Sequence, residues 1–271
     1  ARWVAVWVSL ALIFNLLVWA WRGPASALEF LTGYLIEKSL SVDNLFVFLV
    51  IFKYFALPVA LYHTVLVWGI VGAVVLRGAM IGAGAALIMQ FHWVLWLFGL
   101  FLIYTAIKLA TQREEEVHPD RNALVRLARR IWPVTPRYVG GKFFVRRAGA
   151  WAMTPLFVVV LAVEGTDVLF ATDSIPAIFA ITRDPFIVFT SNIFAILGLR
   201  AIFFLLAGII HKLRYLRYGL ALVLGFIGVK MLIEAWVHIP TFLSLGIVGL
   251  ILGGSVGLSL LADRRARRPP R

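Results

Sequence analysis

The stretch Val163-Glu164-Gly165-Thr166-Asp167-Val168-Leu169-Phe170-Ala171-Thr172-Asp173-Ser174-Ile175-Pro176 places three carboxylates in a run that is otherwise apolar enough to cross a membrane. On insertion scales, an acid at the centre of a bilayer costs roughly 3 kcal/mol. Acids kept at that depth pair with bases, line water or bind a cation. These three carboxylates are therefore the first candidates for a functional site.

The spacing of the three acids indicates how they could meet. Glu164 and Asp167 are three residues apart and share a helix face, whereas Asp173 lies about 120° further round an unbroken helix. Pro176 cannot donate a hydrogen bond to the carbonyl of Thr172, so we expect a kink or an unwound turn beside Asp173. Such a break would add free backbone oxygens to the carboxylate ligands.

Composition fixes the broad class of the protein. Of the 271 residues, 62% are hydrophobic, which indicates an integral membrane protein and excludes water-soluble classes. The absence of cysteine removes disulfides, thiolate ligands and thiol nucleophiles. The net charge of +13 is explained by basic cytoplasmic loops, so we expect no nucleic-acid partner.

The fold class that we predict is an all-α polytopic membrane protein, in which about eight transmembrane helices form a single membrane domain. The predicted spans are Trp3–Trp21, Leu28–Phe52, Tyr62–Met89, Trp93–Ala110, Trp151–Ile181, Phe186–Ile210, Tyr218–Trp236 and a final helix at 241–261. The third and last spans carry glycine pairs four residues apart, Gly78/Gly82 and Gly249/Gly253, which permit close helix contact.

The distribution of lysine and arginine predicts the orientation. Most of these residues fall on the side of the N-terminus, whereas only Arg22 and Arg183 lie in connections on the other side. The positive-inside rule then predicts that both termini of this multi-pass membrane protein lie in the cytoplasm.

Residues 28–110 and 151–236 look like two copies of a three-span unit. Each copy has an acid pair six residues apart and one arginine in its second span: Glu37, Asp43 and Arg77 in the first, and Asp167, Asp173 and Arg200 in the second. Three spans per copy give the copies opposite orientations in the membrane. Inverted repeats of this kind are typical of secondary transporters, whose substrate site lies at the repeat interface.

A cytoplasmic linker at 111–150 separates the two predicted repeats. Leu124, Leu127 and Ile131 recur there with helical spacing beside Arg126, Arg129 and Arg130. A regulatory or lipid-binding role for these arginines is open, although a solvated basic loop is the simpler interpretation.

Ligand chemistry narrows the choice of cation. The acids predicted to lie within spans outnumber the bases there, and this excess negative charge suits a divalent cation. Oxygen ligands suit Mn²⁺, Mg²⁺ or Ca²⁺, whereas Zn²⁺ and copper favour thiolate or imidazole. All five histidines lie near span ends or in loops. The alternative that acids and bases only pair to brace the helices stays open.

Four stretches resemble the TerC family of bacterial membrane proteins: Gly33 to Asn44, Gly140-Gly141-Lys142-Phe143-Phe144, Val163 to Pro185 and Phe189 to Arg200. The resemblance covers about residues 28–236. It implies a Mn²⁺ exporter related to the LysE-type transporter group, with the family's functional acids at Glu37, Asp43, Glu164, Asp167 and Asp173.

We therefore predict a secondary active transporter that exports a divalent metal, with Mn²⁺ as transported substrate. Proton antiport is open as the coupling, because the sequence does not show the coupling ion. Asp43 and Asp173 are expected as central ligands, and Glu37, Glu164 and Asp167 as further ligands or proton carriers. The supporting residues are Asn44 and Ser174, which add oxygens, and Arg77 and Arg200, which compensate charge in the empty site. We expect no permanently bound cofactor. The expected partners are the metal ion and the lipid bilayer, and a homo-oligomer is open.

Two other classes of function are open. A membrane assembly or metallation factor for other proteins would use the same residues. An intramembrane acid-pair enzyme is supported only by paired aspartates, because the sequence contains no His-Glu-x-x-His, Gly-x-Ser-x-Gly or Gly-x-Gly-Asp motif. We therefore expect that the protein is not an enzyme.

Overall fold

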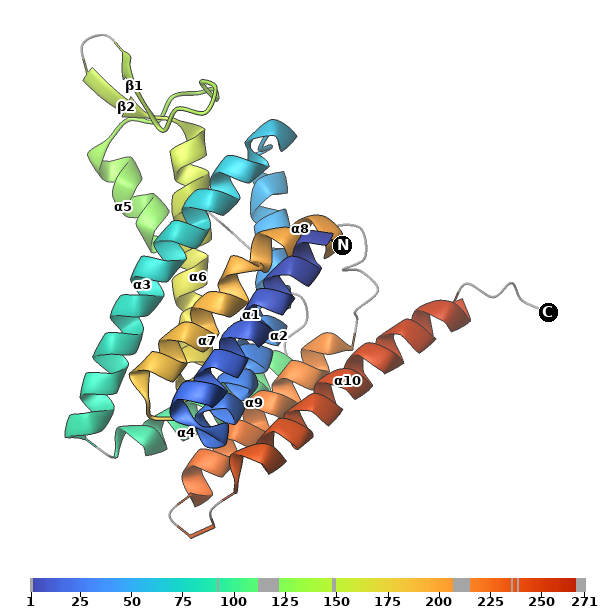
Figure 1. Cartoon of the computed structure of the whole chain (residues 1–271). Coiled ribbons are helices and arrows are strands. Elements are labelled where there is room, and N and C mark those ends of the chain that lie inside the picture. The colour runs from blue at the N-terminus through green and yellow to red at the C-terminus, as the bar shows by residue number, and fades with distance from the viewer. Residues whose placement is uncertain are drawn as a thin grey trace. The chain divides into compact units, whose positions relative to one another are not determined.

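The structure is a computed structural model that describes residues 2–91, 93–111, 122–147, 150–206, 215–234, 236–237 and 239–266 (Figure 1). Within these ranges the side chains at 42, 43, 46, 200, 205, 206 and 263–266 are not described. Two of the predicted site residues, Asp43 and Arg200, thus have side chains outside the described residues.

The described chain is almost entirely helical. The helices are α1 (Arg2–Arg22), α2 (Pro24–Tyr54), the 3₁₀ turn η1 (Val59–Leu61), α3 (Tyr62–Gln90), α4 (Val94–Thr111), α5 (Ala123–Ile131), α6 (Pro155–Phe179), α7 (Pro185–Leu197), α8 (Leu199–Leu206), α9 (Leu216–Ile233) and α10 (Thr241–Ala266). In the described residues, seven helical segments are long and apolar enough to cross a membrane, which confirms the all-α polytopic class. Helix α2, which covers the predicted span 28–52, has 31 residues and is about 46 Å long.

The chain divides into two compact units, and each is described by itself. The first unit comprises Ala1–Asp43, Gly78–Arg113 and Thr172–Arg271, and the second comprises Asn44–Arg77 and Glu114–Ala171. Both units draw on both predicted repeats. The inverted repeat stays a prediction.

In the first unit, glycines bring helices α4 and α9 into backbone contact. A β-carbon on Gly228 would lie 2.8 Å from the carbonyl oxygen of Gly99 and 3.1 Å from the backbone nitrogen of Ile103. Gly225 faces Ala106 one turn further along, so the two helices are antiparallel. Only glycine fits at the crossing.

Helix α10 packs on α9 through a different face from the one predicted. Its buried positions are Ser244, Val248, Leu252, Ser255 and Ser259. Ser255 lies against Gly219 of α9, and the backbone N–H of Tyr215 donates to Ser259 Oγ at 3.0 Å.

Three of the glycines that we expected at helix contacts have no such role among the described residues. A β-carbon on Gly82, Gly249 or Gly253 would meet no described atom within 4 Å, whereas one on Gly78 would lie 3.2 Å from the ring of Phe189. The packing prediction is therefore wrong within the described chain, except at Gly78.

The predicted span 186–210 is divided into α7 and α8 at Gly198. Lys38 Nζ donates to the carbonyl oxygen of Ala195 at 2.9 Å, and a β-carbon on Gly198 would collide with that amine. In a continuous helix that carbonyl would accept from the backbone N–H of Leu199. At the end of α7, the side chain of Lys38 from α2 therefore donates to a carbonyl oxygen that would otherwise accept a hydrogen bond from the helix backbone.

Helix α6 differs from its prediction at Pro176 and at its start. It runs without interruption through Pro176, so the unwound turn that we expected beside Asp173 is wrong. It also begins at Pro155 rather than Trp151, because 150–153 forms a strand.

The second unit contains a small hairpin that the sequence analysis missed. Strands β1 (Phe144–Arg147) and β2 (Ala150–Met153) pair antiparallel, and Met153 also bridges to Val134. The ring of Phe144 lies 4.6 Å from that of Phe157 at the start of α6, measured between centroids. Thr154 Oγ1 donates to the carbonyl oxygen of Lys142 at 2.7 Å. The described part of the linker is therefore folded onto α6.

Candidate functional site

A buried ion pair joins α3 and α6 within the second unit. Arg77 donates from Nε to Asp167 Oδ2 at 2.8 Å and from Nη2 to Oδ1 at 2.7 Å. The side chains are 1% and 6% exposed. The planar guanidinium matches the carboxylate in a two-point contact, which is the strongest arrangement for such a pair. Arg77 and Asp167 thus neutralise each other in this structure.

Glu164 lies one helical turn before Asp167 and packs against a glycine of α3. Its carboxylate rests directly on Gly72, where any β-carbon would collide with it. The side chain is buried, and among the described residues neither of its oxygens has a hydrogen-bond partner. A buried carboxylate without a partner is costly, so this position calls for a proton, water or a cation.

Helix α2 carries a row of buried oxygen atoms in the first unit. Tyr34, Glu37 and Ser41 lie at positions i, i+3 and i+7 and are all buried. Glu37 Oε2 accepts a hydrogen bond from Asn192 Nδ2 at 3.3 Å. The hydroxyls of Tyr34 and Ser41 have no hydrogen-bond partner among the described residues. An amide group therefore donates to Glu37, and two hydroxyl groups lie on the same face of α2.

The remaining predicted residues are not members of the ion pair. Asp173, in the first unit, accepts from Thr105 Oγ1 of α4 at 3.0 Å. Ser174 and Asn44 are buried, and their supporting role stays a prediction. The side chains of Asp43 and Arg200 are outside the described residues.

The structure shows which predicted residues meet. It brings Arg77, Asp167 and Glu164 to the facing parts of α3 and α6, and it joins Glu37 to Asn192 and Asp173 to Thr105. Within the described part of the chain, no group of three or more His, Cys, Asp or Glu side chains is arranged to hold a metal ion.

Sequence reasoning missed several neighbours of the acids: Gly72, Tyr34, Ser41, Thr105 and Asn192. For two of them a signal was present. Ser41 follows Glu37 by four residues on one helix face, and Thr105 is a hydroxyl in the middle of the apolar helix α4. Gly72 gave no signal, because its role depends on the helix that faces it.

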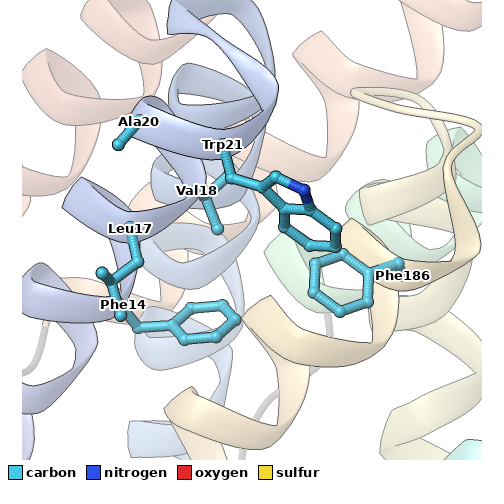
Figure 2. Close-up of a pocket in the computed structure, with 6 residues that line it drawn as sticks. All are labelled: Phe14, Leu17, Val18, Ala20, Trp21 and Phe186. Carbon is cyan, nitrogen blue, oxygen red and sulfur yellow. The ribbon is translucent and has the colours of Figure 1, made fainter.

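A shallow hollow in the first unit, between α1 and α7, is of a different kind (Figure 2). It is lined by Phe14, Leu17, Val18, Ala20, Trp21 and Phe186. The rings of Trp21 and Phe186 meet edge to face with centroids 5.8 Å apart. This lining offers no ligand for a cation.

The fold and the site together define a polytopic α-helical membrane protein that keeps carboxylates inside its spans. The chain belongs to the integral membrane protein TerC family, whose family model matches residues 22–267.

Named relatives cover most of the chain. It is 54% identical over 264 residues to "Uncharacterized membrane protein STKORF319" of Myxococcus xanthus, covering 97% of this chain and 83% of that protein. It is 52% identical over 260 residues to "Putative membrane-bound redox modulator Alx" of Escherichia coli (strain K12), covering 93% and 81%. It is 45% identical over 258 residues to "Thylakoid membrane protein TERC, chloroplastic" of Arabidopsis thaliana, covering 95% and 67%. No solved structure matches the chain.

Proposed function

We propose that this protein is a secondary active transporter that exports a divalent metal ion, Mn²⁺ in the first place, through carboxylates within its spans. It would act in the bacterial inner membrane with both termini in the cytoplasm, and it would not be an enzyme. The proposed ligands are the five acids named from the sequence: Glu37, Asp43, Glu164, Asp167 and Asp173.

The observation that carries the proposal is the state of Glu164. Its carboxylate is buried in a helix long and apolar enough to span a membrane, and it has no hydrogen-bond partner among the described residues. The nearby base, Arg77, donates to both oxygens of Asp167. A divalent cation would supply the counter-charge that Glu164 lacks.

The chemistry of the neighbouring groups supports a hard cation. Neutral polar groups accompany two of the predicted acids: Tyr34 and Ser41 share the helix face of Glu37, Asn192 Nδ2 donates to Glu37, and Thr105 Oγ1 donates to Asp173. Mn²⁺, Mg²⁺ and Ca²⁺ are bound by oxygen ligands, whereas Zn²⁺ and copper prefer nitrogen or sulfur. We propose Mn²⁺ among the three because of the family resemblance.

Charge compensation assigns a role to each of the three charged residues where α3 faces α6 in the second unit: Arg77, Glu164 and Asp167. Asp167 would be held by Arg77 while the metal is absent and would become a ligand when Arg77 turns away, which requires two states with different contacts. Glu164 would take up a proton when the metal leaves, which couples export to proton entry.

The names of the relatives suggest a second class of function. A redox role within these 271 residues would need chemistry other than thiols, because they contain no cysteine. An assembly or metallation factor would use the same acids, and only transport measured on the purified protein separates it from an exporter.

The proposal is tested by equilibrium Mn²⁺ binding to the purified protein, followed by the loss of the electron paramagnetic resonance signal of free Mn²⁺. We expect the wild type to bind Mn²⁺ and Glu164→Gln to bind about tenfold or more weakly, because ligand charge sets affinity for hard cations. Glu29→Gln, which removes an acid of α2 outside the proposed set, serves as the control and should bind like the wild type. Equal affinity of Glu164→Gln and the wild type would contradict the proposal.

A further inference from the structure

Helix α5 presents three different faces. Val125 and Ala128 are buried. The apolar residues Leu124, Leu127 and Ile131 lie on one flank at positions i, i+3 and i+7, and they are 37%, 56% and 57% exposed. An apolar flank with this exposure indicates a surface that contacts a membrane or another protein.

The opposite flank of α5 is basic. Arg126, Arg129 and Arg130 lie at positions i, i+3 and i+4 and are all exposed. The described linker segment 122–147 also carries Arg137, Lys142, Arg146 and Arg147, and it contains no Asp or Glu. This described segment therefore has a net positive charge, to which an anionic surface is complementary.

Asn122 fixes the position along the axis of α6 at which α5 begins. Its side chain accepts from the backbone N–H of Leu124 at 3.0 Å and donates to the carbonyl oxygen of Ala162 at 3.2 Å, and it fills the space over Gly165. Gly165 lies ten residues after the start of α6 at Pro155, which is about 15 Å along the helix axis.

The other end of α5 is tied near the start of α6. The backbone N–H of Met153 donates to the carbonyl oxygen of Pro133, and that of Thr135 donates to Met153, both at 2.9 Å. Helix α5 thus runs alongside the first turns of a candidate membrane span (Figure 1). Because a span of this length crosses a hydrocarbon core of about 30 Å, we expect lipid beside the exposed flanks of α5.

We propose that α5, which lies beside the first turns of α6, binds anionic phospholipid. Leu124, Leu127 and Ile131 contact acyl chains. Arg126, Arg129 and Arg130 extend toward the surface and hold headgroup phosphates, because a long arginine side chain can keep its charge in the headgroup layer. A second copy of the chain fits less well, since three apolar side chains are far fewer than the roughly 20–30 residues per side of a stable interface.

The test measures the lipid composition next to α5. The chain has no cysteine, so Leu127→Cys provides a single site for a fluorophore in protein reconstituted into phosphatidylcholine and phosphatidylglycerol vesicles. Brominated phosphatidylglycerol and brominated phosphatidylcholine are compared as quenchers at equal mole fraction. Gly253→Cys, an exposed position of α10 with open space around it, is the matched control.

We expect brominated phosphatidylglycerol to quench the label at 127 several-fold more strongly than brominated phosphatidylcholine, with about a fivefold preference for each arginine that reaches a headgroup. The two lipids should quench equally at 253. Replacing Arg126, Arg129 and Arg130 by Gln should bring the ratio at 127 to one, and unchanged quenching at 253 would show that this variant is still inserted.

Two results would overturn the proposal. Equal quenching by both lipids at 127 in the wild type would show that α5 has no preference for anionic lipid. No quenching by either lipid at 127 would show that the flank faces water or protein. The proposal does not depend on metal transport, so either result leaves the proposed function untouched.

Discussion

Removing Arg77 should cost this protein more stability than most single substitutions. In Arg77→Gln the carboxylate of Asp167, which is 5% exposed, would lose both of its charged hydrogen bonds. At a charge separation of about 4 Å and an effective dielectric constant near 20, the lost attraction is about 4 kcal/mol. Measured losses for breaking one half of a buried pair are about 3–5 kcal/mol. We expect a loss within that range.

A double-mutant cycle tests whether this cost comes from the pair itself. Arg77→Gln, Asp167→Asn and the double variant would be unfolded reversibly by sodium dodecyl sulfate in mixed micelles. The double variant leaves no buried charge at this pair, so it should lose less than the sum of the single variants by at least about 2 kcal/mol.

The pair of Arg22 with Asp184 is the matched control. These side chains are 30% and 36% exposed, so solvent screens their attraction. Their coupling energy should stay below about 1 kcal/mol. Additive losses at Arg77 and Asp167, or coupling no larger than at the exposed pair, would refute the reasoning.

Two further predictions concern packing and pH. Gly228→Ala should lower the free energy of unfolding by about 1–3 kcal/mol, because its β-carbon would meet the backbone of α4. The control Gly253→Ala has open space around its β-carbon and should be neutral or stabilising. The same unfolding assay compares the two variants, and equal effects would contradict the α4–α9 contact. Burial raises the pKa of Tyr138, whose hydroxyl donates to the carbonyl oxygen of Phe55 at 2.7 Å, to about 12. Its contribution to stability should be complete below pH of about 10 and lost as the pH rises through about 12. The absorbance difference at about 295 nm between the wild type and Tyr138→Phe should show a tyrosine that ionises near the higher value, and ionisation near 10 would disprove the burial.

The apolar spans were the most predictable part of the fold. Runs of apolar residues long enough to cross a bilayer place helices whatever they pack against, so the third and last spans begin as predicted at Tyr62 and Thr241. The basic amphipathic stretch of the linker was likewise confirmed as α5. These features depend on local sequence alone.

The misses depend on contacts between distant residues. The division of the span 186–210 arises where Lys38, more than 150 residues away in sequence, donates to a backbone carbonyl. The hairpin has strands of only four residues, and its order depends on the ring of Phe157. Short elements held by tertiary packing carry little signal in one sequence.

The site shows the same division. The sequence predicted acids within the spans, and Glu164, Asp167 and Asp173 do lie in the candidate span Pro155–Phe179. The charge-compensating role of Arg77 stays a prediction. The sequence could not show that Arg77 pairs with Asp167, 90 residues away, or that Glu164 would rest on Gly72 without a hydrogen-bond partner among the described residues. Which of two neighbouring acids on one helix face pairs with the arginine depends on the residues of the facing helix.

The central claim is best tested by metal flux into proteoliposomes that contain a metal-sensitive dye. Mn²⁺, Mg²⁺, Ca²⁺ and Zn²⁺ would be compared, with and without a pH gradient, for the wild type, Asp173→Asn and the control Glu29→Gln. We predict Mn²⁺ flux that the pH gradient accelerates, that Asp173→Asn abolishes and that Glu29→Gln retains. No flux of any of the four cations through protein shown to be folded would contradict transport and favour an assembly factor.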